Sequence, residues 1–263
     1  MDHFFIWNID PVLLDFGAVK IRWYGLMFAS GFVGSFLTMQ WIYQREGKKI
    51  EELDTLLWYM VVATIVGARL GHVLLYDPGY YLSHPLKILA VWEGGLASHG
   101  ATLGIIAALF LYRRQYGDGF LWLLDRVCIP TALAGALIRV GNFFNSEILG
   151  IASEQPWAVI FARIDWTPRH PVQLYEAFCY LFIYATTLQL YKKFAGKQGL
   201  VFGCFISLLF SVRFVLEYFK TEQAMYDNGL TLTTGQLLSV PFVLAGLACV
   251  AFSLTRERRK SVG

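Results

Sequence analysis

Hydrophobic and polar positions alternate along this chain in long blocks, with extended apolar runs separated by short charged segments. A helix needs about 20 apolar residues to cross a bilayer. Seven runs come close to that length, so the pattern predicts seven transmembrane helices. The predicted spans cover residues 23–43, 55–75, 95–112, 121–141, 174–191, 199–218 and 235–254.

Composition agrees with a lipid environment, because 56% of residues are hydrophobic, 16% are charged and the mean hydropathy is +0.50. An ordinary soluble domain carries about 25% charged residues. The predicted fold class is therefore an all-α polytopic membrane protein, with residues 1–263 forming a single integral-membrane domain. The first segment lacks the basic region and cleavage site of a signal peptide, and its Phe4, Phe5 and Trp7 suit an interfacial segment.

The charged segments predict the orientation in the membrane. Twelve basic residues fall on one side, at Arg45, Lys48, Lys49, Arg113, Arg114, Lys192, Lys193, Lys197, Arg256, Arg258, Arg259 and Lys260. Six fall on the other, at Lys20, Arg22, Lys87, Arg163, Arg169 and Lys220. The positive-inside rule places the twelve in the cytoplasm, so the N-terminus faces outward and the C-terminus inward. Residues 151–169 then predict a small outward-facing head or flap with β character, within about 145–172.

Four basic residues remain inside or at the edge of predicted spans: Arg69, Arg126, Arg139 and Arg213. A charge at the bilayer centre costs at least about 2.5–3.5 kcal/mol on insertion scales, so such residues indicate a functional site unless they reach an interface. For Arg126, which lies beside Asp125 near the start of its span, interfacial placement is an equal alternative.

The densest polar group is the segment IRVGNFFNSEILG, residues 138–150. Helical spacing places Arg139, Asn142 and Ser146 on one stripe, with Asn145 beside it. An arginine fork suits a phosphate because it donates two parallel charge-assisted hydrogen bonds. The group therefore predicts a lipid-headgroup site, and the alternative is an interhelical hydrogen-bond network without a ligand.

Three other segments carry polar residues. In WEGGLASHG, residues 92–100, His99 starts an apolar helix and is either a base for a thiol or a helix-start histidine held by backbone. In PRHPVQLYEA, residues 168–177, Glu176 either caps a helix or pairs with a buried arginine. In FSVRFVLEYFK, residues 210–220, an intrahelical pair of Arg213 with Glu217 is weak, which leaves Arg213 for a ligand.

Zinc-protease, serine-hydrolase and P-loop motifs are absent, and no His, Cys and Asp ligand set is clustered in the sequence, so we expect no metal or nucleotide cofactor. No nucleic-acid partner is expected either. A transporter or lipid flippase with an arginine-lined anion path is the alternative to an enzyme. The chain lacks the matching broken helices in two halves that favour a transporter.

At GALIRVGNFFNSEILG the chain resembles the bacterial phosphatidylglycerol–prolipoprotein diacylglyceryl transferases. Further segments look like the family in the family order: RWYGLMF (22–28), GARLGHVLLYD (67–77), WEGGLASHGA (92–101), RHPVQLYEA (169–177) and RFVLEYFK (213–220). The resemblance implies a seven-span enzyme of the bacterial inner membrane. It implies transfer of a diacylglyceryl group from phosphatidylglycerol to the lipobox cysteine thiol of a prolipoprotein signal peptide, with a thioether and glycerol-1-phosphate as products.

The resemblance also implies roles for single residues. Arg139 and Arg213 match the expected phosphate-binding pair. His99, Tyr24, Asn142, Glu147 and Gly150 match positions important in the family, whereas Asp125, His170 and Glu176 match weaker candidates. Asn145 matches the family's Asn-x-Glu pattern and is a further substrate-binding candidate. The family has a functional tyrosine four residues before its second arginine, where this chain has Leu209. Our hypothesis therefore gives the thiol proton to His99.

Overall fold

A computed structural model describes residues 4–17, 20–91, 94–95, 97–221 and 232–262 of the chain. They divide into two compact units. The first unit holds residues 1–38 and 124–263, and the second holds residues 39–123. Two helices, α1 (Trp23–Arg45) and α5 (Phe120–Asn145), contribute residues to both units.

Each predicted span coincides with a helix. Besides α1 and α5, these helices are α2 (Ile50–Leu75), α4 (Ser98–Tyr116), α6 (Val172–Phe194), α7 (Leu200–Leu216) and α8 (Thr234–Val262). Five of the helices, α1, α2, α5, α8 and the run Leu200–Phe219, are long and apolar enough to cross a membrane by length and composition. The helix α4 and the helix α6 lie outside that set. The structure thus supports a polytopic, mainly helical membrane protein with five candidate spans among its described residues.

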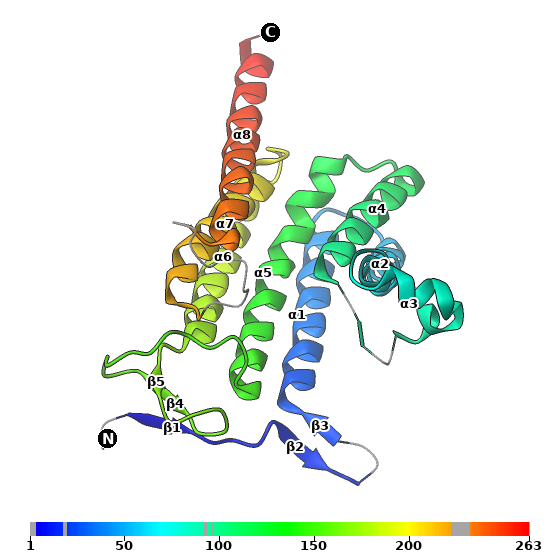
Figure 1. Cartoon of the computed structure of the whole chain (residues 1–263). Coiled ribbons are helices and arrows are strands. Elements are labelled where there is room, and N and C mark those ends of the chain that lie inside the picture. Colours follow the sequence, from blue (N-terminus) through cyan, green and yellow to red (C-terminus); the bar gives the residue numbers. More distant parts are fainter. Residues whose placement is uncertain (1–3, 18–19, 92–93, 96, 222–231, 263) are drawn as a thin grey trace. The chain divides into compact units, whose positions relative to one another are not determined.

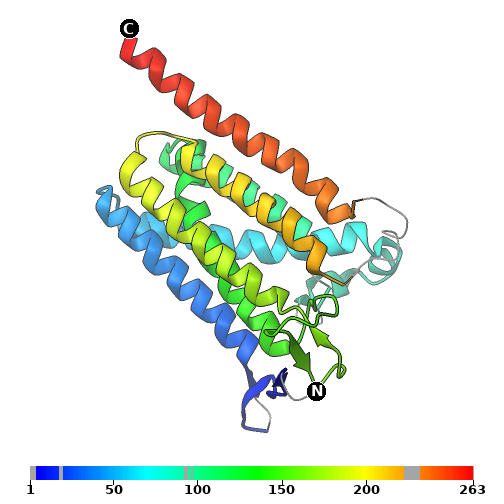
Figure 2. The same ribbon diagram turned by 90° about the vertical axis from the view of Figure 1, so that its left-hand side faces the viewer.

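In the first unit, α7 lies between α6 and α8, and the three run side by side (Figure 2). Glycines allow the close approach of α7 and α8, because a Cβ added at Gly203 would lie 2.8 Å from the carbonyl oxygen of Gly246. The helices α1 and α5 approach in the same way, with Gly31 against the backbone of Ala134. As a result, the first turn of α6 and the last turn of α5 lie at the same end of the first unit (Figure 1).

The all-α prediction is wrong in one respect, because strands form beside that end of the unit. The strand β1 (Phe5–Trp7) pairs in parallel with β4 (Val159–Phe161), and β4 pairs antiparallel with β5 (Pro168–Arg169). A second sheet joins β2 (Val12–Asp15) to β3 (Lys20–Arg22). The N-terminal segment, expected only to lie at the membrane interface, buries Trp7 against Phe143 of α5 and Phe161 of β4 instead.

The β character expected for residues 151–169 is confirmed by β4 and β5. The head sheet packs on α5 through aromatic rings, with the Trp7 and Phe143 centroids 4.4 Å apart. The helix α8 ends at the opposite end of the first unit from β1, as Figure 1 and Figure 2 both show.

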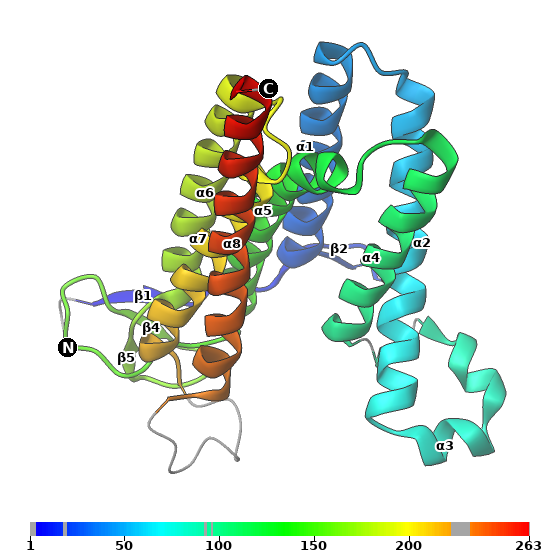
Figure 3. The same ribbon diagram turned by 90° about the horizontal axis from the view of Figure 1, so that it is seen from above.

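The second unit is organised by α2 and α4, which pack through glycines. A Cβ at Gly100 of α4 would overlap the carbonyl oxygen of Gly67, and one at Gly71 of α2 would lie 2.7 Å from the Gly100 Cα. Two short helices, α3 (Pro78–Ser83) and the 3-10 helix η1 (Pro85–Leu89), follow α2 (Figure 3).

The position of Arg69 within a predicted span suggested a functional site, but in the structure this residue of α2 does not present its charge to a ligand. It is 3% exposed, and its guanidinium donates to the carbonyl oxygens of Lys87, Ile88, Gly94 and Gly95. Arg69 therefore ties both η1 and the segment after it to α2. Trp92, Glu93 and Leu96 of the same glycine-rich segment lie outside the described residues.

Candidate functional site

Arg139 lies near the end of α5 and is anchored by an acidic residue on α6. Its Nε is 2.8 Å from Oε2 of Glu176, whose side chain is 1% exposed. The other carboxylate oxygen, Oε1, is 3.0 Å from Nζ of Lys220. Both contacts are ion pairs by distance, without hydrogen-bond geometry. Of the two roles expected for Glu176, the structure thus supports pairing with a buried arginine.

The pairing leaves a buried acid with a cation on each side. Arg139 keeps 19% of its side chain exposed, whereas Lys220 keeps 8%. Lys220 also lies 3.4 Å from Oε2 of Glu217, so Glu217 pairs with Lys220 rather than with Arg213. The carboxylate of Glu176 holds the Arg139 guanidinium by its Nε edge and leaves the Nη groups directed elsewhere.

The end of α5 folds into a tight polar turn around Glu147. The Asn142 amide donates to Glu147 Oε2 at 2.9 Å, and the Asn145 amide donates to Oε1 at 3.0 Å. The Arg139 Nη1 reaches Asn142 Oδ1 at 3.4 Å. Backbone φ angles of 57° at Ser146 and 56° at Ile148 allow the chain to reverse there. The structure therefore brings Arg139, Asn142, Asn145 and Glu147 together, as the sequence predicted.

Gly150 lies where three chain segments meet. An isolated bridge pairs it with Lys220, and the flanking Ile151 amide donates to the Phe219 carbonyl at 2.9 Å. A Cβ at Gly150 would overlap the carbonyl oxygen of His170. Gly150 thus allows the segment His170–Val172 to lie close to the chain that follows α5, a steric role that does not require contact with a ligand.

Tyr24 and Arg213 have different surroundings in the first unit. Tyr24, at the start of α1, packs on Gly141 of α5, and a Cβ added at Gly141 would lie 3.0 Å from the Tyr24 Cδ2. Arg213 is exposed on α7 and has no ion pair among the described residues.

His99 belongs to the second unit, where it is the second residue of α4 and is exposed. Its neighbour Gly100 packs tightly against Gly67 and Gly71 of α2, which fixes the backbone beneath the histidine. Its assignment as a base remains a prediction.

Asp125 and His170, the weaker candidates, have structural partners. Asp125 is 1% exposed and accepts hydrogen bonds from the backbone N–H groups of Gly199 at 2.6 Å and Phe202 at 2.8 Å. It therefore satisfies donors at the start of α7 that lack partners within the helix. His170 Nδ1 lies 3.0 Å from the Tyr175 hydroxyl, which accepts from Trp157 Nε1 at 2.7 Å. His170 thereby links the head to α6.

Arg126 is buried and follows Asp125 in α5, and it also has partners within the first unit. Its Nη2 donates to the carbonyl oxygen of Ala195 at 3.2 Å, and its guanidinium lies 5.4 Å from the ring centroid of Tyr191. These contacts join α5 to the end of α6, which favours a structural role.

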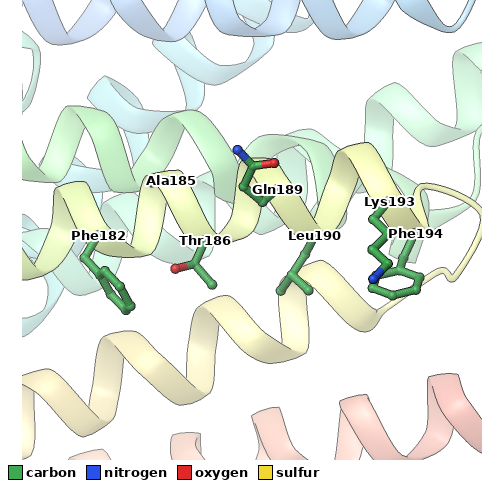
Figure 4. A pocket seen from close by; sticks show the side chains of 7 residues that line it. All are labelled: Phe182, Ala185, Thr186, Gln189, Leu190, Lys193 and Phe194. Carbon is green, nitrogen blue, oxygen red and sulfur yellow. The ribbon is translucent and has the colours of Figure 1, made fainter.

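A separate hollow of about 430 Å³ lies along the later turns of α6. Figure 4 shows its lining side chains, which are mostly apolar and come from one helix. They are Phe182, Ala185, Thr186, Gln189, Leu190, Lys193 and Phe194. None of them belongs to the polar cluster, which comprises the side chains joined at the first turn of α6 and the end of α5: Arg139, Asn142, Asn145, Glu147, Gln173, Glu176 and Lys220.

Two members of the polar cluster were not assigned to a site from the sequence. Lys220 was counted only as an outward-facing loop cation, and Gln173 only as a residue near the start of a helix. Gln173 is 0% exposed and donates from Nε2 to the Glu147 carbonyl oxygen at 2.6 Å. Its spacing of three residues from Glu176 was the available signal, since it places both side chains on one face of a helix.

Known proteins are similar to this chain over nearly its whole length. A family model described as prolipoprotein diacylglyceryl transferase matches residues 11–252. A phosphatidylglycerol–prolipoprotein diacylglyceryl transferase from Tolumonas auensis is 51% identical over 96% of this chain and 99% of its own length. One from Chloroherpeton thalassium is 45% identical over 97% of this chain and 96% of its own length. One from Azoarcus sp. is 40% identical over 92% of this chain and 94% of its own length.

Proposed function

The chain belongs to the prolipoprotein diacylglyceryl transferase family, and from this premise we propose how its side chains perform the transfer. The protein is a membrane enzyme that transfers the diacylglyceryl group of phosphatidylglycerol to prolipoproteins. The family match covers both compact units, so we treat residues 1–263 as one integral-membrane domain. The transporter alternative has no observation in its favour.

The proposed reaction joins the thiol sulfur of the lipobox cysteine in the signal peptide to the glyceryl carbon that carries the phosphate ester. A C–S bond forms as the C–O bond to phosphate breaks, and glycerol-1-phosphate leaves with the bond's electron pair. The thiol proton passes to a base, because the thiolate is the nucleophile. Negative charge that grows on the leaving phosphate requires cations preorganised in a water-poor site.

Arg139 carries the proposal, because it is the arginine fixed inside the polar cluster. Glu176 holds its Nε, so the guanidinium is oriented before substrate arrives. We assign the phosphate to Arg139 and Arg213, with Lys220 as an additional nearby cation. Asn142, Asn145 and Glu147 bind the headgroup side, and Tyr24 lines the approach. His99 is the proposed proton acceptor.

We further propose that α4 and α6 also cross the membrane, which gives seven spans in the bacterial inner membrane. Both are helices of sufficient length, with 19 and 23 residues. The N-terminal segment and the head would then face the periplasm, and the C-terminus the cytoplasm. The opposite placement of β1 and the end of α8 supports an odd number of crossings.

The test is mass spectrometry of a lipobox peptide incubated with purified protein and phosphatidylglycerol. We expect a diacylglyceryl mass gain that is strongly reduced in Arg139→Lys and Arg213→Lys, because lysine cannot make the two parallel hydrogen bonds of a guanidinium. Full activity in both variants would refute the phosphate assignment. A normal rate for His99→Gln would refute the assignment of the base and leave the phosphate assignment standing.

A further inference from the structure

Three polar atoms around Glu147 are buried and have no hydrogen-bond partner among the described residues. They are Oε1 of Gln173, Oγ of Ser146 and Oδ1 of Asn145. Folded proteins leave few buried polar groups unpaired, since each costs about 1–3 kcal/mol. Gln173 is 0% exposed and Ser146 5% exposed, so bulk water does not readily supply these partners.

We propose that Gln173 and Ser146, together with Asn145, form an acceptor subsite that binds the hydroxyl groups of a glycerol headgroup and so selects the lipid substrate. This inference rests on the proposed function, since it concerns the headgroup of the same donor lipid. It adds Gln173 and Ser146 to the site and gives them a role in specificity rather than in the chemical step.

The orientation of the Gln173 amide is fixed by its surroundings. Its Nε2 donates to the Glu147 carbonyl oxygen at 2.6 Å, so the nitrogen is occupied and Oε1 is the free end. The Asn145 Nδ2 is likewise occupied by Glu147 Oε1 at 3.0 Å, which leaves its oxygen free. Both amides are therefore held with their donors used and their acceptors available.

The chemistry of these atoms distinguishes the two parts of a phosphatidylglycerol headgroup. Phosphate oxygens only accept hydrogen bonds, so they are suited to Arg139 and Lys220 and not to amide oxygens. Hydroxyl groups donate, so they suit Gln173 Oε1 and Asn145 Oδ1, while the Ser146 hydroxyl can act in either sense. Gln173 and Glu176 lie three residues apart on α6, which places the Gln173 acceptor on the same face of the helix as the carboxylate that holds Arg139.

The test compares two donor lipids with the same phosphodiester charge. Phosphatidylglycerol carries headgroup hydroxyls, and phosphatidylethanol carries none. Gln173→Met keeps the side-chain length and removes the Oε1 acceptor together with the Nε2 donor to the Glu147 carbonyl oxygen. We expect kcat/KM for phosphatidylglycerol to fall roughly 3- to 10-fold, as for one neutral hydrogen bond to the headgroup. The value for phosphatidylethanol should stay within about twofold, since the variant leaves phosphodiester binding intact.

Ser146→Gly provides a second variant, because glycine suits the φ of 57° and removes only the hydroxymethyl group. It should reduce the preference for phosphatidylglycerol in the same direction. Gln189→Met, on the same helix but outside the polar cluster, is the matched control and should leave the preference unchanged.

Three results would overturn the inference. Equal losses with both lipids would show that Gln173 only supports the fold, and an unchanged preference in both variants would show that water alone satisfies these atoms. Loss of preference in Gln189→Met as well would show that the effect is not local. Failure of the proposed function would look different from these results. The unmodified enzyme would then transfer a diacylglyceryl group from neither lipid, or Arg139→Lys would be as active as the unmodified enzyme with both lipids.

Discussion

Replacing Glu176 with glutamine tests whether this buried carboxylate balances two cations. Glu176→Gln keeps the shape of the side chain and removes its charge, leaving Arg139 and Lys220 facing a neutral amide where carboxylate oxygens lay 2.8 and 3.0 Å away. Breaking a buried ion pair by removing one partner costs about 3–5 kcal/mol. Arg139 is 19% exposed and Lys220 keeps Glu217 at 3.4 Å, so we take the lower value, about 3 kcal/mol.

A loss of that size should lower the Tm of the purified protein by roughly 6–12 °C, at 2–4 °C per kcal/mol. The structure predicts a second, more specific effect. A bound phosphate supplies the negative charge that the variant lacks, so phosphatidylglycerol should raise the Tm of Glu176→Gln by more than it raises that of the unmodified protein. The assay is thermal unfolding in nanodiscs with and without phosphatidylglycerol, in an otherwise zwitterionic lipid.

Glu217→Gln is the matched control, because its carboxylate is 18% exposed and its one ion pair among the described residues is the 3.4 Å contact to Lys220. A partly exposed pair of this kind contributes about 1 kcal/mol or less, so its Tm should change little. A Tm of Glu176→Gln equal to that of the unmodified protein would refute the charge balance. An equal response to phosphatidylglycerol in all three proteins would refute the placement of phosphate beside Arg139.

Three further substitutions have expected outcomes. Asp125→Ala removes the acceptor for the Gly199 and Phe202 amides and should cost about 2 kcal/mol in thermal unfolding without changing kcat/KM of the folded fraction. Gly150→Ala places a Cβ on the His170 carbonyl oxygen, so it should reduce transfer at least about tenfold by displacing Lys220; activity within twofold would contradict this. The hydrogen bond from Arg169 holds the pKa of Asp165 in the folded protein below its ordinary value. At pH values above the pKa of the unfolded chain, the ionised carboxylate therefore stabilises the head. This stabilisation is lost as the pH falls through the lower pKa of the folded state. Asp165→Asn, at a partly exposed pair, should therefore cost about 0.5 kcal/mol at pH 7 and nothing at strongly acidic pH, by thermal unfolding across pH.

The helices could be predicted from sequence because each is a single apolar block with its own charged borders. The run 121–141 illustrates this, since it lies within α5. The polar turn after Arg139 was also predictable, because its residues are close in sequence and helical spacing places several of them on one stripe. The β character of residues 151–169 followed from their composition, but the pairing of β1 with β4 joins residues about 150 positions apart, which no local pattern encodes.

The contacts of single charges were harder to predict. Glu176 had an arginine as one possible partner, but nothing in the sequence indicated that Lys220 binds its other oxygen. That contact joins segments far apart in the chain, where an isolated bridge pairs Gly150 with Lys220. Arg69 had the same sequence signal as Arg139, an arginine within an apolar run, and only its four backbone carbonyl partners distinguish a structural arginine from a site arginine.

The most direct test of the central claim is a cryo-EM structure of the active protein in nanodiscs that contain phosphatidylglycerol. If Arg139 binds the phosphate, this structure predicts lipid density with its phosphate within about 3 Å of the Arg139 guanidinium. It also predicts the headgroup glycerol on the side of Gln173 and Asn145. A phosphate bound elsewhere, with no contact to Arg139 in a preparation that transfers diacylglyceryl groups, would contradict the account.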